Sequence, residues 1–221
     1  MSLTGQGAVA IWHDIAPEGR AGFYAWHGLE HMPERAAIPG FVRGRRYVAI
    51  EGTPQYFNLY ETTSTSVLTG SDYLARLNAP TSWTVATVKH FRHVARALCR
   101  VAMSKGSGDG GLVATFRYDI EDDAALIAGV ERLVASIAAE PDVAGAHLLI
   151  ADTAGSAIET AEKRARSEGT AIPRVVALVE SWGDSLPFVA RARAFAVEAF
   201  QHALPQPDWA VYRLQNTRAN R

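Results

Sequence analysis

A short stretch near the N-terminus, HGLEHMPE, places residues that could transfer protons or bind a metal at a regular spacing. His27 and His31 lie four residues apart, and Glu30 directly precedes the second histidine. On a helix, two histidines at this spacing share a face, and the order HxxEH is that of the inverted zinc-peptidase signature. The stretch therefore supports two interpretations, a metal site and a site for acid–base chemistry on an organic substrate.

Pro33 argues against the metal site. A proline has no N–H to donate to the carbonyl of Leu29, and it disfavours helical geometry at the residue before it. His31 is thus expected in the last turn of a helix, where the spacing of the two imidazoles is not fixed. We therefore expect no metal ligands here, and we interpret His31 as the acid or base, with Glu30 or His27 tuning it.

The faces of this helix can be assigned by advancing 100° per residue over residues 18–34. Four residues form an apolar side that we expect to pack on a sheet: Ala25, Trp26, Leu29 and Met32. Four groups that can exchange protons share another arc: His27, Glu30, His31 and Glu34. A solvated helix face explains that arc equally well, because polar residues opposite an apolar stripe are common.

The elements that must position this helix occur in the same order twice. The first half has expected strands at 7–15, 39–50, 55–62 and 93–103 and helices at about 18–31 and 71–90, the latter broken near Pro80. The second half has strands at 111–120, 141–152, 174–182 and 208–217 and helices at 122–139 and 185–203. The order β-α-β-β-α-β is that of a ferredoxin-like unit. We predict an α+β protein of two tandem ferredoxin-like units, whose sheets face each other with the helices outside.

A connector rich in glycine and serine, SKGSGDGG at 104–111, separates the halves. We therefore expect one unit over 1–103, which carries the candidate pocket, and a second over 112–221. The second half also carries an insertion at 153–171, in which Glu159 and Lys163 are spaced to stabilise a surface helix. Since the second half lacks a His-x-Pro element, we expect the chemistry in the first half, with the second acting mainly as the covering sheet.

Taken together, the motif around His31 resembles that of a known family. Its elements are Phe23, Trp26, His31 with Pro33, Pro39-Gly40 and Tyr47. They are similar to the EthD-like branch of the dimeric α/β-barrel superfamily, although Trp26 and His31 stand one residue further apart and Glu34 replaces the usual leucine. The resemblance implies a barrel-type pseudo-dimer in one chain and a small cavity between helices and sheet for an apolar or aromatic molecule. It assigns a role to His31 alone, as acid or base.

Neighbouring residues extend the candidate site. On the strand 41–50, Tyr47 shares a face with Phe41, Arg43, Arg45 and Ala49. Tyr47 is a candidate catalytic donor to a substrate oxygen, and Arg45 a candidate partner for an enolate or carboxylate. Three further residues are candidates for lining the pocket: Trp26, His13 and Trp83. Solvated arginines and structural aromatic or histidine residues are the simpler alternatives.

Composition excludes several partners. The 221 residues carry a net charge of −1 and no long basic stripe, so we expect no nucleic acid. No apolar run reaches the ~18 residues of a membrane span, and the lone Cys99 is consistent with a reducing cytoplasm. A homodimer is compatible with the sequence.

The function expected from these observations is an enzyme acting on a small apolar or aromatic molecule by isomerase, cyclase, oxygenase or dehydratase chemistry, with no cofactor. Two alternatives stay open. One is a barrel that binds a small ligand without turnover. The other is a metal- or haem-dependent protein, for which His147 and His202 are candidate axial ligands.

Overall fold

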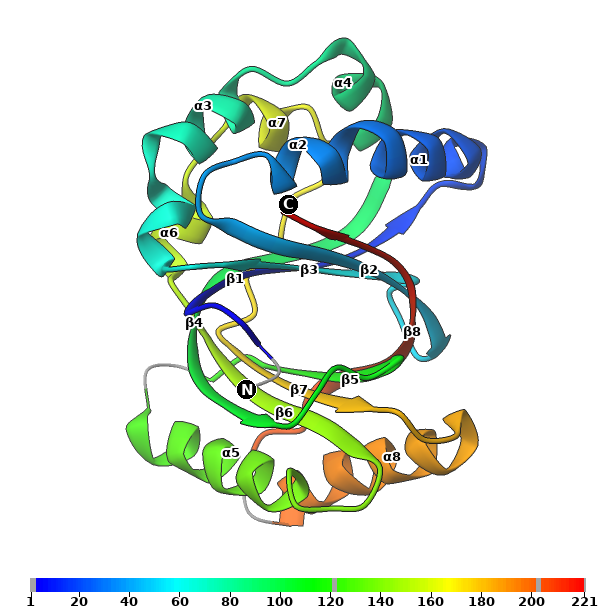
Figure 1. Ribbon diagram of the computed structural model, residues 1–221, viewed down its shortest axis with the longest axis vertical. Coiled ribbons are helices and arrows are strands. Elements are labelled where there is room, and N and C mark those ends of the chain that lie inside the picture. The colour runs from blue at the N-terminus through cyan, green and yellow to red at the C-terminus, as the bar shows by residue number, and fades with distance from the viewer. Residues whose placement is uncertain (1–2, 121–122, 202–203, 221) are drawn as a thin grey trace.

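The structure, a computed structural model, describes residues 3–120, 123–201 and 204–220, and its described strands close into a single barrel (Figure 1). The first half supplies β1 (Gly7–Ile15), β2 (Phe41–Glu51), β3 (Tyr56–Thr62) and β4 (Phe91–Gly106). The second half supplies β5 (Leu112–Tyr118), β6 (Val143–Ala151), β7 (Val175–Ser181) and β8 (Asp208–Ala219). All pairs along the barrel are antiparallel.

Both halves use the same strand order. It is β4-β1-β3-β2 in the first half and β8-β5-β7-β6 in the second, and the halves join where β2 pairs with β8 and β4 with β6. The prediction of two tandem ferredoxin-like units in one chain is confirmed. Because each unit closes the other, no described barrel strand is left with an open edge.

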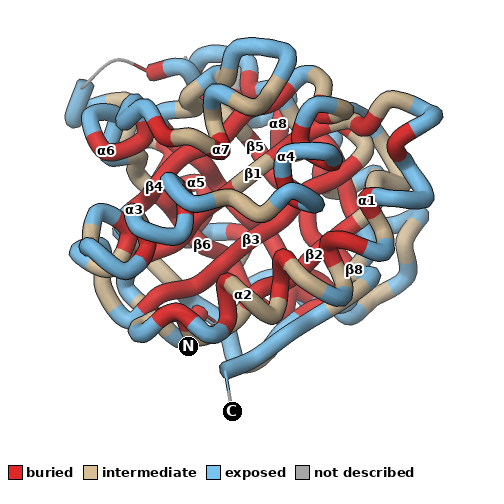
Figure 2. Tube along the Cα trace, turned by 90° about the horizontal axis from the view of Figure 1, so that it is seen from above, coloured by how far each residue is buried: buried red, intermediate tan, exposed pale blue. Residues whose placement is uncertain are grey.

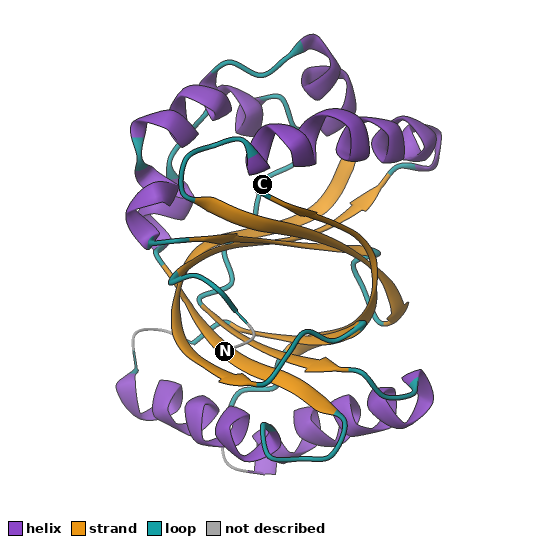
Figure 3. Ribbon diagram, viewed as in Figure 1, coloured by secondary structure: helices purple, strands orange, loops and turns teal. Residues whose placement is uncertain are grey.

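Helices cover the two outer faces of the barrel (Figure 3). Over the first half lie η1 (Pro17–Gly19), α1 (Arg20–Trp26), η2 (His27–His31), α2 (Met32–Ala36), η3 (Thr65–Thr69), α3 (Ser71–Asn78) and α4 (Ser82–Val88). Over the second lie α5 (Ala124–Ile137), capped by the Asp123 side chain, and α8 (Ser185–Gln201). The helix predicted at 71–90 is divided near Pro80, as expected. Among the described residues, no helix is long and apolar enough to cross a membrane.

The barrel interior is filled by side chains that alternate along the strands. Small residues on β1 and β4, such as Ala10 and Ala97, leave room for the large rings of Trp12, Phe57 and Tyr212. The rings of Trp12 and Phe57 stack with their centroids 5.0 Å apart. Figure 2 shows that the strands are largely buried and that exposed residues gather on the helices and connections. The barrel interior is thus a packed core that both halves share, in addition to the cores between each sheet and its helices.

Two expected elements differ in extent. β4 continues through residues 104–106 of the expected connector, because Ser104–Gly106 pair with β6. The insertion at 153–171 forms two short helices, α6 (Thr153–Ala157) and α7 (Ala161–Arg164), and these lie over the first half beside α3 (Figure 1). Lys163 and Glu159 form the expected ion pair at 2.7 Å, although Glu159 precedes the helix. The second half therefore contributes to the helix layer of the first, which the sequence did not indicate.

Candidate active site

The helix that carries HGLEH does not end before Pro33. Residues 27–31 form a π-helical turn, and the N–H of Met32 donates to the carbonyl of His27. The helix then continues to Ala36. A π-turn accommodates one extra residue. It also allows the helix to pass Pro33 without the backbone N–H that a proline lacks. Residues 27–31 thus hold one residue more than an α-helical turn would.

The expected assignment of the helix faces was partly wrong. Trp26 and Met32 are buried as expected, but Leu29 is 76% exposed and Ala25 is exposed. The arc that carries the histidines is partly turned toward the sheet rather than being a solvated face, and His27 and His31 are buried with Phe23. The outer face of the sheet offers one of these imidazoles a polar partner, because the Tyr60 hydroxyl shares a hydrogen bond with His27.

His13 lies on this outer face, and Trp12 points into the barrel, as the alternation predicted. Asn58 Nδ2 donates to His13 Nε2 at 3.0 Å, and His13 Nδ1 lies 3.3 Å from the carbonyl oxygen of Asp14. Its ring stacks on Phe91 with centroids 4.2 Å apart. Burial lowers the pKa of His13 to about 3, so this imidazole is neutral at physiological pH.

His27 and His31 are neighbours beneath the π-turn. Their ring centroids are 5.4 Å apart, and His31 lies 4.3 Å from the nearer ring centroid of Trp26. The Tyr60 hydroxyl and His27 Nε2 share a hydrogen bond of 3.2 Å. The Nδ1 atoms of both histidines have no hydrogen-bond partner among the described residues. Burial lowers the pKa of both histidines well below the ordinary value. The charge of His31 lowers the pKa of His27 further, and the charge of Arg35 lowers the pKa of His31 further.

Gly44 makes the position of Tyr60 possible. It pairs with Tyr60 across β2 and β3, and a Cβ at residue 44 would lie 2.7 Å from a Tyr60 ring carbon. Without that Cβ, the ring lies against β2 and its hydroxyl reaches His27. The glycine therefore helps to orient one of the imidazoles.

Charged groups close the layer above the histidines. Arg35, one turn beyond His31, contacts Glu162 of α7 in an ion pair between two buried side chains. Arg166 lies 3.7 Å from the same carboxylate. The guanidinium of Arg35 also lies 5.8 Å from the Tyr73 ring centroid. The insertion from the second half thus supplies the carboxylate that pairs with Arg35.

Tyr47 and Arg45 are separated from His31 by the sheet. Both point into the barrel, where Arg45 Nη1 donates to Glu180 at 2.9 Å and its guanidinium lies 3.2 Å from Glu61. The Tyr47 ring stacks on Phe57. Strand alternation kept Arg43, Arg45 and Tyr47 on one face as expected, but that face is the inner one. Phe41 is the exception, because a β-bulge after it turns its side chain outward against Tyr73.

Glu30, Trp26 and Trp83 occupy different positions around α4. Glu30 Oε1 accepts hydrogen bonds from Thr81 at 2.6 Å and Thr84 at 3.2 Å. The Trp26 indole N–H donates to Thr84 at 3.1 Å. Glu30 therefore holds the helix against α4 and is not directed at the imidazoles. Trp83 is 38% exposed on α4 and does not enclose them.

The described residues offer no arrangement of side chains for a metal ion, because no group of three or more His, Cys, Asp or Glu among them could hold one. His147 lies inside the barrel, with Nδ1 3.0 Å from Ser104 Oγ and Nε2 3.5 Å from Glu180, so neither nitrogen faces a space for a macrocycle. His202 lies outside the described residues.

Several residues of this layer were not identified from the sequence. Arg35 could have been found, since it follows His31 by four residues and continues the same helix face. Tyr60 is as likely a core aromatic as a catalytic residue on sequence grounds, and its position on alternate residues of β3 with Asn58 was a usable signal. Glu162 gave none, because its contact with Arg35 spans 127 positions, and Arg166 belongs to the same cluster only through Glu162.

The corresponding layer of the second half provides an internal contrast. Between α5, α8 and the outer face of the second sheet, the buried side chains are almost entirely apolar, with Phe116 and Phe195 at its centre. The two layers have the same architecture, yet buried imidazoles and arginines occur in the first. Such groups are costly to bury, which distinguishes the first layer as the candidate site.

No family model and no curated protein matches the chain. Several solved structures share its fold. An anthrone oxidase-like protein has a TM-score of 0.62 at 13% identity and covers 100% of this chain and 96% of its own. Candidate monooxygenases from Fusobacterium nucleatum and Lactobacillus acidophilus have TM-scores of 0.60 and 0.56 at 8% and 10% identity, with coverage of 96% or more of each chain. The chain therefore has the fold of the dimeric α/β-barrel superfamily, with both ferredoxin-like units in one polypeptide.

Proposed function

We propose that the helix–sheet layer of the first half is the active site of a small-molecule enzyme, in which His31 takes a proton from an apolar, aromatic organic substrate. The observation that carries this proposal is the group of three buried imidazoles, two of which have unpartnered Nδ1 atoms, next to a buried arginine. Of the three, His31 keeps the largest accessible fraction, 6%. It is thus the imidazole best placed to meet a ligand.

The environment suits a base that starts neutral. Because burial lowers the pKa of His31, the imidazole is unprotonated at physiological pH and can accept a proton. Proton transfer from a carbon or hydroxyl group of the substrate creates an imidazolium and a substrate anion side by side, and each charge stabilises the other. Arg35 provides a second positive charge for the anion. His27, held by Tyr60, limits how the His31 ring can turn.

The solved structures of the same fold support the choice of substrate class. They include an anthrone oxidase-like protein and two candidate monooxygenases. Anthrone is an aromatic carbon acid, so it is a suitable first probe for proton abstraction. The proposed reaction includes the acid–base chemistry expected of an EthD-like protein.

The test is the exchange of anthrone methylene hydrogens with D₂O under nitrogen, followed by oxygen uptake in air. We expect His31→Gln to lower the exchange rate by about 10²–10⁴-fold, the usual contribution of a general base, while circular dichroism stays unchanged. The matched control is His93→Gln, because His93 is an exposed histidine on β4; its exchange rate should equal that of the wild type. Equal rates in the wild type and His31→Gln would contradict the proposal.

The alternative is a barrel that binds a ligand without turnover. It is favoured by the dense aromatic packing around His31, where Trp26, His27 and Tyr60 all contact the ring. Retention of anthrone by both the wild type and His31→Ala, with no exchange by either, would identify the protein as a binder.

A further inference from the structure

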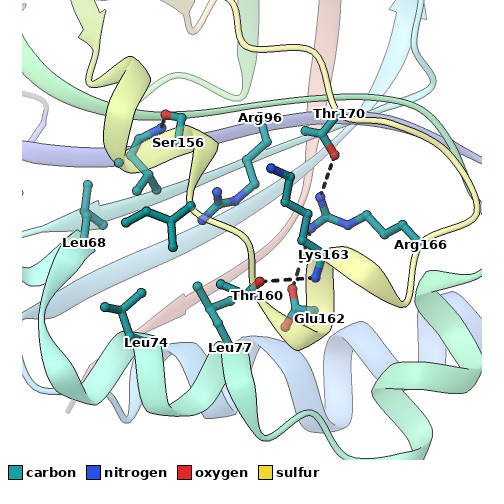
Figure 4. A pocket seen from close by; sticks show the side chains of 13 residues that line it. Leu68, Leu74, Leu77, Arg96, Ser156, Thr160, Glu162, Lys163, Arg166 and Thr170 are labelled. Carbon is teal, nitrogen blue, oxygen red and sulfur yellow. Dashed lines mark hydrogen bonds and ion pairs between the residues drawn. The ribbon is translucent and has the colours of Figure 1, made fainter.

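A small cavity lies beside the histidine layer, between the outer face of the sheet, α3 and the segment 153–171. Its volume is about 20 Å³, close to the space of one water molecule. Figure 4 shows two kinds of wall. Leucines Leu68, Leu74 and Leu77 form one side, and cationic Arg96, Lys163 and Arg166 lie on the other. The cavity is therefore amphipathic.

The cations around this cavity outnumber the carboxylates. Arg96 donates one hydrogen bond, to the Tyr73 hydroxyl at 2.9 Å, and it has no ion pair with any described residue. Arg166 is 3.7 Å from Glu162, but that carboxylate is also in direct contact with Arg35. Lys163 pairs with the exposed Glu159. Glu162 is thus shared by two buried arginines, and Arg96 is left without a counter-charge.

Unsatisfied donors accompany this imbalance. Arg166 is almost completely buried; its Nη1 donates to Thr170 at 3.2 Å, whereas its Nε has no partner. Burial, with a further contribution from Arg96, lowers the pKa of Arg166 even though Glu162 opposes the shift. A buried cation without full compensation destabilises the folded protein. An anion in the cavity would relieve this cost.

We propose that this cavity binds the anionic group of a small apolar organic acid, with Arg96 and Arg166 as its ligands and the leucine wall against the apolar part. The carboxylate or phenolate oxygens enter the cavity, and the tail lies over Leu74 at its mouth. The assignment of this ligand as the substrate rests on the proposed function. The link is Arg35, which joins Glu162 at the cavity to the helix of His31.

The two sites are coupled by charge. The positive charges of Arg35 and Arg166 contribute to the lowered pKa of His31, after burial. An anion bound at Arg96 and Arg166 offsets part of that charge, so the pKa of His31 rises when the ligand is present. The bound acid would thereby make His31 a stronger base.

The experiment is calorimetric titration at pH 7.5 and constant ionic strength, with hexanoate as the probe and hexanamide as its neutral counterpart. We expect hexanoate to bind at least tenfold more tightly than the amide. Arg96→Gln and Arg166→Gln should each weaken hexanoate binding at least tenfold. Arg76→Gln, which removes an exposed arginine from α3 outside the cavity, should leave it unchanged. Equal affinities for acid and amide, or unchanged affinity in both cavity variants, would overturn the proposal.

A second variant guards against loss of folding in the arginine variants. Leu74→Trp keeps every charge and fills the mouth of the cavity from a half-buried position, so it should abolish hexanoate binding; binding at the wild-type level would count against this location. His31→Gln separates the two proposals. If wild type does not bind hexanoate yet exchanges anthrone protons, the anion pocket alone fails. If His31→Gln binds hexanoate and still exchanges, the proposed function alone fails.

Discussion

Burial decides the charge state of the three histidines in the first helix layer. His13, His27 and His31 all have a pKa below the ordinary value, and desolvation is the largest cause in each. A neutral imidazole can sit among aromatic rings at little cost, whereas an imidazolium cannot. Burial, rather than residue type, thus separates these residues from the exposed His93.

The same burial predicts that acid destabilises the protein. In the unfolded chain each histidine titrates near pH ~6.5, whereas the native state binds the proton only at lower pH, about 3 for His13. The unfolded state therefore binds more protons below pH ~6.5, and the free energy of unfolding falls as pH falls. The slope is at most about 1.4 kcal/mol per pH unit for each histidine, or about 4 for three. Urea unfolding at pH 8, 7, 6 and 5 measures it.

A single variant checks the origin of this slope. His13→Gln should lose about one third of the slope between pH 6 and 5, while its stability relative to wild type at pH 8 reports the packing change alone. A wild-type free energy of unfolding that is constant from pH 8 to 5 would contradict the assignment of neutral native histidines.

At the scale of elements, the π-turn sets the orientation of the candidate base. Residues 27–31 form the π-turn, the helix continues beyond it to Ala36, and Arg35 contacts Glu162. The hydrogen bond from the Trp26 indole N–H to Thr84 fixes Trp26. The π-turn displaces His31 relative to Trp26. π-Turns inside helices are frequently found at functional sites.

Deleting Gly28 should convert the π-turn into an ordinary α-helical turn. Nothing lies within 4 Å of a Cβ built at this residue, so no side chain packs against this position. We expect the variant to fold, with the NMR signals of the His27 and His31 rings shifted and anthrone exchange lowered to the level of His31→Gln. Gly28→Ala, the control, should keep the π-turn and gain about 0.5–1 kcal/mol of stability. Wild-type ring signals and exchange in the deletion variant would disprove the role of the π-turn.

At the scale of the whole molecule, the two halves share one core, whereas the candidate site lies over the first half. The barrel interior contains side chains of both units, and a buried ionic network crosses it from Arg45 on β2 to Glu180 on β7 and His147 on β6. Burial raises the pKa of Glu180, but His147 and Arg45 outweigh it and lower that pKa to about 2. Since the barrel closes within one chain, a homodimer is not needed to complete it.

Removing Arg45 should therefore destabilise the entire molecule. Arg45→Met leaves the carboxylates of Glu61 and Glu180 buried without this partner, so we expect a loss of about 3–5 kcal/mol. Because both units contribute to the interior, unfolding followed by tryptophan fluorescence and by circular dichroism should remain one coincident transition. Arg76→Gln, a change at an exposed ion pair, should cost less than about 1 kcal/mol. Separate transitions for the two signals would show that the halves unfold independently.

The sequence by itself determined the architecture and named the central imidazoles. The repeated order of strands and helices depends on local periodicity and turn residues, so it was readable without coordinates, and the HGLEH spacing identified His27 and His31. Strand alternation also placed Trp12 and His13 on opposite faces, and Arg45 and Tyr47 on a common one.

Only the tertiary structure decided which of those faces is inside the barrel and which lies beneath the helices. It placed Tyr47 and Arg45 on the opposite side of the sheet from His31, turned the polar helix arc inward, and brought Glu162 from the second half into contact with Arg35. The physical reason is that burial and long-range ion pairs depend on which surfaces meet, and local spacing along the chain carries no information about segments more than a hundred residues away.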